Sequence, residues 1–540
     1  MIRQQQPVLA PGHQSPKKVN AWILGSSIAS LASAVHLICD AKVPASQIHI
    51  LESHDIPGDG IISAGDPVTG YNYRAGCMPT YNDACMERLL NLVPSATNSN
   101  VTILEEIKKF NVEMPFQDSP GTHVLIRGDN RLEKMEASKF GIGLKDRMDL
   151  LLLMLKSEQT LGRKRIDELF NRRFFNGTFW IVLSTLFNFQ PWHSAAEFRR
   201  CLRRYSYEFR SLNTKKILDC TRYNQYESII VPIVRFLQNK GVDFRFRIKV
   251  TDIVTISDND IESVAAINIV QNNSEEIINV CTNDIVIVSI GSVTSGSSSG
   301  SNTVPALPPS MEAVNELDEN WSLWLDLGTK NPKFGNPYKF CTHVSESRLV
   351  TFTVTLNDAA GFFNRFLELT NGRPGSGSLV SLKHSNWMIS LCIPHQPFFS
   401  NQPNNIDVLW GYGLYPSQEG NFVKMPMTLC NGKEIMAELL WHLDFPMEPI
   451  LSNSITIPCV MPRMAAALLP RNSTDRPDVT PENVTNLAIV GQFVEIADET
   501  TVSLDYSVRG AQLALSRLMG IEGPPMRRRA FHTPFSYFWR

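Results

Sequence analysis

The chain has 540 residues, of which 43% are hydrophobic and 19% charged, a composition typical of a globular protein with two or three domains. Its formal net charge is -2, which gives no support for nucleic-acid binding and leaves a lipid or a neutral small molecule open as a partner. The ten cysteines stand singly, with no CxxC pair, so we expect no structural zinc and no other metal site.

The first 20 residues are polar and contain proline, and we expect them to form a flexible N-terminus. No apolar run approaches the roughly 18 residues that a membrane span requires. These features predict a cytoplasmic protein with reduced cysteines.

Residues 21–52 predict a strand, a tight turn, a helix and a second strand. The apolar run Ala21–Leu24 enters a turn of small residues, and a helix follows. Backbone amides at such a helix N-terminus suit a pyrophosphate. The second strand ends at Glu52, where a carboxylate commonly accepts hydrogen bonds from the ribose of an adenosine cofactor. The stretch therefore predicts a dinucleotide site, and a strand-helix-strand unit without a ligand is the alternative.

The turn departs from the usual G-x-G-x-x-G pattern because serine occupies both later glycine positions. Ser27 stands where the backbone should approach the phosphates most closely. Its side chain could reduce cofactor affinity, although its hydroxyl could also donate to a phosphate. The turn residues expected to contact the cofactor are Gly25, Ser26, Ser27, Ile28, Ala29 and Ser30.

Residues 53–207 predict a loop that passes over the cofactor, a helix over about 81–92, and then a lid or an insertion that includes a helix over 144–156. Residues 171–207 are rich in aromatic side chains, which indicates either a large apolar cavity or, more commonly, core packing. His193 in this stretch is a catalytic candidate, and a hydrogen-bonded core histidine is the alternative.

The later part of the chain predicts a return to the first sheet. An amphipathic helix over 226–239 and a strand over 284–290 resemble the second part of a doubly wound sheet, and a Ser/Gly loop follows, either a linker or a cofactor-facing turn. Residues 304–470 mix strands such as Leu349–Leu356 with helices such as 361–370, and suggest a substrate-side domain. The strand Leu487–Val490, a glycine turn and a helix from about residue 505 then complete the site.

Together these elements predict an α/β fold. It consists of a FAD-binding, Rossmann-type domain like that of flavoproteins with two dinucleotide-binding domains, a mixed α+β substrate domain and a short C-terminal tail. The expected division is a discontinuous FAD domain (21–100, 215–300 and 485–520), a helical lid or substrate region (101–214), a substrate domain (301–484) and a tail (521–540).

Long blocks of the sequence carry a specific resemblance. They are AWILGSSIASLASAVHLI, HILES, YRAGCMPTYNDACMERLLNLVPS, FQPWHSAAEFRR, TRYNQYESIIVPIV, FGNPYKFC and NLAIVGQFVEIADETTVSLDYSVRGA. In these blocks the chain resembles the oleate hydratases, also called the myosin-cross-reactive antigen family. The resemblance implies a three-part flavoprotein-like fold that binds FAD, mainly as a structural and electrostatic element. It also implies the addition of water to a double bond of a long-chain unsaturated fatty acid, without net redox change.

Further positions are implied to contact the FAD. They are Glu52, Ser53, Gly60, Arg74, Gly76, Val250, Gly291, Ser292, Gly491, Glu495, Thr501 and Ser503.

This sequence departs from the family at both catalytic positions. In the family, a carboxylate after R-G-G-R activates water and a tyrosine after E-x-R-R delivers a proton to the alkene. Here Met78 and Cys201 stand at those positions. A thioether has no proton to exchange and a neutral thiol is a poor acid toward an alkene, so we do not expect ordinary oleate hydration.

Three nearby residues are candidate replacements. Tyr205 lies four residues after Cys201 in a predicted helix, on the same side and displaced by about 5 to 6 Å. Near Met78 stand Tyr81 and Asp83, of which only Asp83 is a carboxylate able to act as a base. The structural alternatives are that Tyr205 packs in the core and that Asp83 caps a helix.

Three functions follow, in this order of preference. The first is an enzyme that isomerises or cyclises an unsaturated lipid or polyketide-like chain, in lipid or secondary metabolism. The second is a hydratase with relocated acid and base, and the third is a non-catalytic protein that binds FAD or lipid. The sequence leaves open whether the protein forms a homodimer.

Peripheral membrane contact also stays open. Many relatives continue into a membrane-associated helical region where this sequence ends, which argues against membrane attachment. The basic residues Arg527–Arg529, next to aromatic residues up to Trp539, could still form a short interfacial anchor, and a solvated or packed tail is the alternative.

Overall fold

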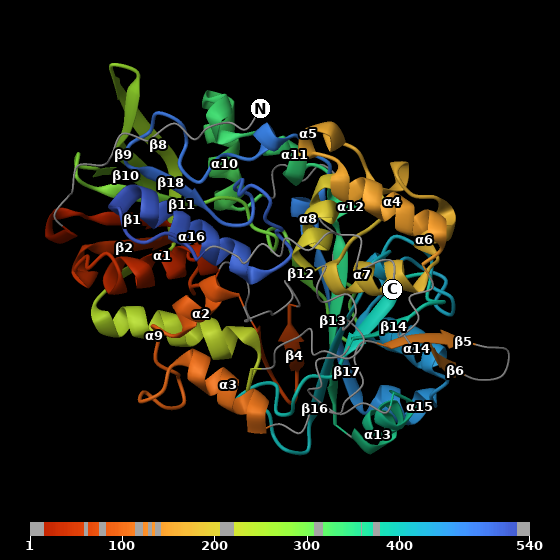
Figure 1. The fold of residues 1–540 in the computed structure, drawn as a ribbon. Helices are drawn as coiled ribbons and strands as arrows, with labels where there is room; N and C mark the ends of the chain where they lie inside the picture. Colours follow the sequence, from red (N-terminus) through yellow and green to blue (C-terminus); the bar gives the residue numbers. More distant parts are fainter. Residues whose placement is uncertain are drawn as a thin grey trace.

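The computed structural model describes residues 16–58, 63–74, 83–113, 123–127, 132–135, 142–205, 221–306, 317–357, 359–370 and 379–525. Two large sheets with their covering helices form the two sides of the molecule in Figure 1. The chain passes between the two sides several times, so each side is assembled from segments far apart in the sequence.

One side is built on a parallel five-stranded sheet in the order β18-β11-β1-β2-β7. Its strands are β1 Ala21–Leu24, β2 Ile48–Glu52, β7 Asp243–Phe246, β11 Ile285–Ser289 and β18 Leu487–Val490. All residues of β11 and β18 are buried, which explains their continuous apolar sequence. The predicted Rossmann-type half of an α/β fold is therefore confirmed.

Four helices lie beside this sheet. α1 (Ile28–Cys39) packs against α16 (Leu504–Met519) and α9 (Val231–Lys240), and α2 (Ala84–Leu90) packs against α16. The helix predicted over 226–239 is divided into a π-helical turn, η5 (Tyr226–Ile230), and α9. Pro232 causes this change, because it has no N–H to donate to the preceding turn. The helix predicted over 81–92 is observed as α2, while residues 81 and 82 lie outside the described part.

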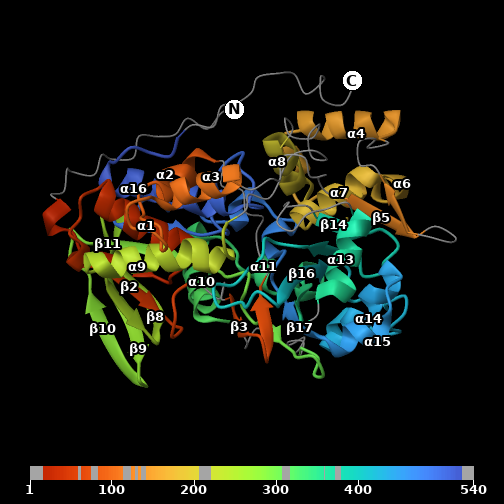
Figure 2. The same ribbon diagram turned by 90° about the horizontal axis from the view of Figure 1, so that it is seen from below.

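A smaller antiparallel sheet projects from the same side of the molecule (Figure 2). It contains β8 (Ile248–Asp258), β9 (Ile261–Gln271) and β10 (Ser274–Asn279) in the order β10-β9-β8. α10 (Glu319–Lys330) packs against β8, and α3 (Ile103–Glu113) packs against α2.

The other side is built on a mixed sheet of eight strands in the order β12-β17-β13-β16-β15-β14-β5-β6. Their bounds are β5 His123–Arg127, β6 Leu132–Met135, β12 Ser298–Ser299, β13 Leu349–Leu356, β14 Leu379–Leu382, β15 Ile389–Cys392, β16 Asp407–Gly413 and β17 Ser454–Met461. α14 (Gly432–Leu443) and α15 (Met447–Ser452) pack against β17, and α13 (Ala359–Thr370) packs against α15. This is the mixed α+β part that the sequence predicts.

A helical region lies above one end of the eight-stranded sheet (Figure 2). It comprises α4 (Leu144–Leu155), α5 (Glu158–Leu161), α6 (Arg172–Phe175), α7 (Thr178–Phe187) and α8 (Ala195–Tyr205). The aromatic rings of this region pack on one another: the Phe170 and Phe174 centroids are 4.2 Å apart, and those of Trp180 and Phe198 are 5.7 Å apart. For these rings the core-packing interpretation is confirmed.

Several short elements complete the described chain. They are η1 Pro16–Lys18, η2 Ala45–Gln47, β3 Ser63–Asp66, β4 Gly70–Tyr73, η3 Ile166–Glu168, η7 Pro332–Phe334, α11 Tyr338–Cys341, α12 Val344–Ser347, η8 Met427–Leu429, η9 Ala466–Leu468 and η10 Ser473–Asp475. β3 and β4 form a hairpin that lies on the eight-stranded sheet, where Tyr71 N donates to Thr355 Oγ1 at 2.9 Å and Tyr73 N to Thr353 Oγ1 at 2.9 Å.

The domain boundaries stay a prediction. The β3–β4 hairpin and β12 fall within ranges assigned to the FAD domain, yet the hairpin packs on the eight-stranded sheet and β12 is a strand of it. In the described part of the chain, no helix has both the length and the apolar character needed to cross a membrane.

Candidate nucleotide and substrate site

The turn between β1 and α1 has the backbone geometry of a phosphate-binding loop. Gly25 has φ +90° and donates its N–H to Leu51 O at 2.8 Å. A Cβ at this position would lie 3.2 Å from the Ser289 Cβ and 3.4 Å from Asn320 Oδ1, in a conformation that L side chains rarely adopt. Because α1 begins at Ile28, the amides of Ile28 and Ala29 have no acceptor among the described residues and are available to an anion.

Ser27 fits the turn although it replaces a glycine. Its φ is -59°, an ordinary value for any residue, and it is the N-cap of α1. Its Oγ accepts hydrogen bonds from Ser289 Oγ at 2.9 Å and from Ser30 N at 3.4 Å. The hydroxyl is therefore engaged by β11 and by the first turn of α1.

Glu52 lies at the carboxyl end of β2, close to the same turn. One carboxylate oxygen accepts the Ser26 N–H at 2.9 Å and the Ser26 hydroxyl, and the other accepts the His54 N–H at 2.9 Å and the Ser53 hydroxyl at 3.3 Å. Glu52 is buried, so a charged acceptor is held at the end of the strand. The structure thus brings Ser26, Glu52 and Ser53 together as predicted.

The ends of β11 and β18 meet at the same edge. Gly291 has φ +62° and a Cβ there would lie 2.7 Å from the Phe493 ring, while Gly491 has φ +113°. The Ser292 carbonyl accepts the Trp321 indole N–H at 2.9 Å. The close contact at Gly291 and the positive φ angles of both residues explain why glycine stands at these positions. Because glycine has no side chain, a ligand could approach the backbone closely at this edge of the sheet.

Two buried hydroxyls precede α16. Oγ1 of Thr500 and of Thr501 finds no hydrogen-bond partner among the described residues, and both side chains are at most 2% exposed. Ser503 next to them donates to Asp505. A buried hydroxyl without a partner is costly, so these donors favour a bound polar group at this edge. The residues present therefore fit a dinucleotide.

Four further predicted cofactor residues lie away from this edge or outside the described chain. Val250 is buried in β8 of the smaller sheet, and Arg74, at the end of β4, lies beside the Cys459 thiol of β17. Gly60 and Gly76 lie outside the described residues.

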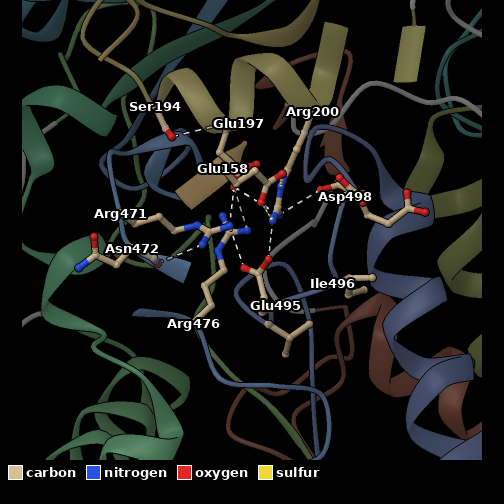
Figure 3. A network of polar contacts seen from close by, with 12 residues as sticks. Glu158, Ser194, Glu197, Arg200, Arg471, Asn472, Arg476, Glu495, Ile496 and Asp498 are labelled. Atoms are coloured by element: carbon tan, nitrogen blue, oxygen red, sulfur yellow. Dashed lines mark hydrogen bonds and ion pairs between the residues drawn. The ribbon is translucent and has the colours of Figure 1, made fainter. Parts of the chain in front are cut away.

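Glu495, predicted to contact the cofactor, is part of a buried ion-pair network (Figure 3). Arg200 of α8 pairs with Glu158 of α5 at 2.6 Å and also with Glu495, and Arg471 pairs with the second oxygen of Glu495 at 2.8 Å. Glu197 completes the network with Arg471 at 2.8 Å and is joined by Arg476 at 3.2 Å. The network ties the helical region to the loop that follows β18.

Charge balance keeps this network ionised. Burial alone would raise the pKa of Glu197, but Arg476, Arg471 and Arg200 together lower it to about 2. Three glutamates pair with Arg200, Arg471 and Arg476, and Arg199 adds a longer contact of 3.6 Å to Glu158, so each carboxylate of the described network has at least one arginine partner. Sequence reasoning missed the partners Glu158, Arg471 and Arg476, and noted only the E-x-R-R block that contains Glu197 and Arg200, and Glu495 as a cofactor contact.

Cys201 and Tyr205 lie one turn apart on the buried side of α8, as the helical spacing predicts. Burial raises the pKa of the Cys201 thiol well above its ordinary value, so the thiol stays neutral. Burial, together with Asp505 nearby, likewise raises the pKa of Tyr205. The Tyr205 hydroxyl has no well-aligned hydrogen-bond partner among the described residues, although Ser503 lies close to it.

Asp83 has the capping role that the sequence left open. Its Oδ1 accepts the Cys85 N–H at 2.9 Å and so caps α2. Arg509 Nη2 lies 3.7 Å from Oδ1, and Arg204 Nη2 lies 3.9 Å from Oδ2. Both carboxylate oxygens of Asp83 therefore already have protein partners. Met78 and Tyr81 lie outside the described residues.

His193 is a core histidine. Its Nδ1 accepts the Gln190 N–H at 3.1 Å, and its Nε2 lies 3.1 Å from the Glu346 carbonyl. Complete burial lowers its pKa to about 4, so the ring is neutral near pH 7 and donates from Nε2. Both nitrogens are occupied, and the structural alternative is confirmed.

The chain is similar to known proteins over nearly its whole length. Residues 18–515 match the MCRA family. The chain is 32% identical over 518 residues to an oleate hydratase of Streptococcus pyogenes serotype M49 (strain NZ131), covering 94% of this chain and 86% of that protein. It is 29% identical over 552 residues to a linoleate hydratase of Lactiplantibacillus plantarum, covering 93% of this chain and 94% of that protein.

Solved structures with a similar fold include two variants of putrescine oxidase. A double mutant gives a TM-score of 0.52 at 11% identity over 92% of this chain and 98% of that chain. A single mutant gives 0.51 at 10% identity over 93% and 98%. At such identity the likeness shows the fold alone.

Proposed function

Because the chain belongs to the MCRA family, we propose that it uses bound FAD to act on a carbon-carbon double bond of a long-chain unsaturated fatty acid without net redox change. Family membership and the Rossmann-type fold indicate FAD as the cofactor. We assign its binding to the β1–α1 turn, Glu52, and the ends of β11 and β18. Bound FAD would supply a flat, polar surface that orders the substrate and stabilises charge next to it.

The proposed proton donor is Tyr205. The single observation that carries this assignment is the burial of its hydroxyl without a well-aligned partner, one helical turn from the family's tyrosine position at Cys201. Burial raises the pKa of Tyr205, which keeps the phenol protonated near pH 7 and also makes it a weaker acid, so donation depends on stabilisation of the phenolate. Arg204, whose guanidinium lies 5.1 Å from the Tyr205 ring centroid, would stabilise the phenolate that forms.

The reaction that we favour is movement of the double bond. Tyr205 gives its proton to one alkene carbon and takes a proton back from the carbon beyond the other end of the double bond. One O–H bond is broken and re-formed, the double bond shifts by one position, and no electrons are gained or lost. A single acid-base group suffices for this reaction, whereas hydration needs a second group that activates water. Among the described residues, Asp83 is the candidate for the group that activates water, and its carboxylate already lies near Arg204 and Arg509.

Hydration is the second candidate, and the two hydratase relatives favour it. One experiment distinguishes the two: FAD-loaded protein is incubated with oleate, with linoleate, and with lipid extract of its own source, in D2O and in H2¹⁸O. Double-bond movement gives a product that contains deuterium and has not gained water. Hydration gives a product heavier by one water and labelled with ¹⁸O. If FAD-loaded protein turns over nothing, a ligand-binding role replaces the catalytic one.

The Tyr205→Phe variant tests the donor. We expect at least about a hundredfold loss of turnover with FAD still bound, the scale of a general acid. Asp83→Asn is the matched control, because asparagine also caps helices, and it should retain most activity. Turnover by Tyr205→Phe at the wild-type rate would remove Tyr205 from the mechanism.

A further inference from the structure

The carboxyl end of β2 has too few free acceptors for a ribose with two hydroxyls. A carboxylate accepts about four hydrogen bonds. Glu52 already receives four, and their donors are Ser26 N and His54 N, each at 2.9 Å, the Ser53 hydroxyl at 3.3 Å and the Ser26 hydroxyl. Glu52 can therefore take a ribose hydroxyl only in exchange for one of the serine hydroxyls, and the second ribose hydroxyl needs another acceptor.

A second acid, Asp318, stands at the same edge of the sheet, at the N-terminus of α10. Two residues further on, Asn320 Oδ1 lies 3.4 Å from the position that a Cβ on Gly25 would occupy, so the first turn of α10 touches the β1–α1 turn. Asp318 N donates to Ser295 Oγ, in the loop after β11, at 3.2 Å. Burial raises the pKa of Asp318 to about 6, and His54 is near enough to oppose that shift.

These contacts place Asp318 between the β1–α1 turn and the end of β2. Gly25 is the first residue of that turn, and His54 follows Glu52 by two positions. In a dinucleotide site of this type the pyrophosphate lies at the turn and the adenosine ribose near the end of the second strand. The ribose would therefore lie beside Asp318 as well as beside Glu52.

The Asp318 carboxylate has acceptor capacity left. Its Oδ1 accepts the Trp321 N–H at 3.1 Å and so caps α10, and the Ser295 hydroxyl lies close to the carboxylate. These two groups are its donors among the described residues, so about half of its acceptor positions are unused. Asp318 is also partly exposed, which leaves it within reach of a ligand.

We propose that Asp318 accepts a hydrogen bond from the adenosine ribose of FAD and shares the two ribose hydroxyls with Glu52. This role depends on FAD lying over the β1–α1 turn, as proposed above, and it adds α10 to the elements that hold the cofactor. Trp321, whose indole N–H donates to the Ser292 carbonyl at 2.9 Å, fixes the first turn of α10 against the loop after β11. The carboxylate is therefore held in place before the nucleotide binds.

The test measures the Kd of the apoprotein for FAD and for FAD analogues that lack either the 2′- or the 3′-hydroxyl of the adenosine ribose, by flavin fluorescence. Asp318→Ser keeps a side chain that caps helices but removes the second carboxylate oxygen. We expect its Kd for FAD to rise at least about tenfold, the scale of a hydrogen bond to a charged acceptor. With one of the two deoxy analogues the wild type and the variant should bind equally, because the hydroxyl that Asp318 contacts is then missing from both complexes.

Asp326→Ser is the matched control. It makes the same change about two turns further along α10, where the side chain is exposed, and it should bind FAD like the wild type. Asp318→Asn separates the contact from the helix cap. Asparagine also caps helices but has an amide nitrogen in place of the second oxygen, so this variant should bind FAD about as weakly as Asp318→Ser.

An unchanged Kd for FAD in Asp318→Ser would overturn the proposal. So would an equal loss for FAD and for both deoxy analogues, because Asp318 would then act on another part of the nucleotide or only on α10. If the wild type itself binds no FAD, the assignment of the cofactor to the β1–α1 turn fails together with this role. If the wild type binds FAD and Asp318→Ser binds it equally well, only the role of Asp318 fails.

Discussion

Single residues at the turn after β1 show how a weak sequence fingerprint can still fold into a turn suited to a nucleotide phosphate. Ser27 needs no positive φ, and its hydroxyl is bonded to β11 and to α1 instead of being left without a partner. Gly25 is the position that a side chain could not occupy without strain. In this turn only the first position of the fingerprint, Gly25, therefore requires glycine.

Glu52→Ala should weaken FAD binding. The change removes the buried acceptor proposed for the ribose and also releases the Ser26 and His54 amides that hold the turn. A hydrogen bond to a charged group contributes about 1.5–3 kcal/mol, so we expect the Kd for FAD to rise by roughly ten- to a hundredfold. Titration of apoprotein with FAD, followed by flavin fluorescence, measures the change. The exposed acid Asp258, far along β8, provides a control: Asp258→Ala should leave the Kd unchanged. An unaltered Kd in Glu52→Ala would show that the carboxylate does not contact the nucleotide.

His193 should make the protein less stable in mild acid. Its folded-state pKa of about 4 lies below the ordinary value of 6.5, so the unfolded chain binds the proton more readily. Its contribution is fully present above pH 6.5 and is lost as the pH falls toward 4, by about 3 kcal/mol in total. The His193→Gln variant lacks this titration. Urea unfolding at several pH values should therefore give a steeper decrease for the wild type than for the variant. Parallel curves for the two proteins over this range would contradict the assignment.

At the level of elements, the network in Figure 3 connects α5 and α8 to the loop after β18. Removing one partner of a buried ion pair leaves the other charge without compensation, at a cost of about 3–5 kcal/mol. Arg200→Met should therefore lower the free energy of unfolding by that amount, as measured by urea denaturation.

The pair Arg203–Asp498 is a control for this prediction, because it joins the same helix and the same loop at the surface. Its nitrogen and oxygen are 3.4 Å apart, and the two side chains are 44% and 47% exposed. Asp498→Asn should cost at most about 1 kcal/mol. If Arg200→Met and Asp498→Asn lower the free energy of unfolding equally, the buried network stabilises the protein no more than a surface ion pair does.

Elements differ in how far the sequence could predict them. The bounds of β1 and β18 match the predicted ranges because each is a short, fully or almost fully buried apolar run. The bounds of β13 match because its β-branched and aromatic residues, which alternate with threonine, favour a strand. The π-helical turn before α9 was missed because its cause, Pro232, was not considered within the amphipathic pattern. The strand ends of the candidate nucleotide site could be predicted, because each is an apolar run followed directly by a glycine or by Glu52. The network could not, since Glu197 and Arg471 are 274 positions apart and Arg200 and Glu495 are 295 apart.

On the scale of the molecule, neither sheet is formed by a continuous piece of chain. The parallel sheet takes strands from residue 21 to residue 490, and the eight-stranded sheet takes strands from residue 123 to residue 461. The β3–β4 hairpin follows β2 directly and yet lies on the second sheet. The buried network also connects the two sides, because it joins α5 and α8 to the loop after β18. Local unfolding of one side would therefore remove contacts from the other.

This interleaving predicts that FAD stabilises the whole molecule and not only the sheet that binds it. A ligand that binds only the native state at a hundred times its Kd adds about 2.7 kcal/mol to the free energy of unfolding. If both sides unfold together, hydrogen exchange of the most protected amides should slow by about a hundredfold on addition of FAD, in β13 and α7 as well as in β1 and α1. β13 and α7 contain none of the predicted FAD contacts, so protection there would report cooperativity. Arg200→Met should reduce the protection that FAD transmits to α7, while Asp498→Asn should leave it intact. Slower exchange confined to β1 and α1 in the wild type would mean that the two sides unfold independently.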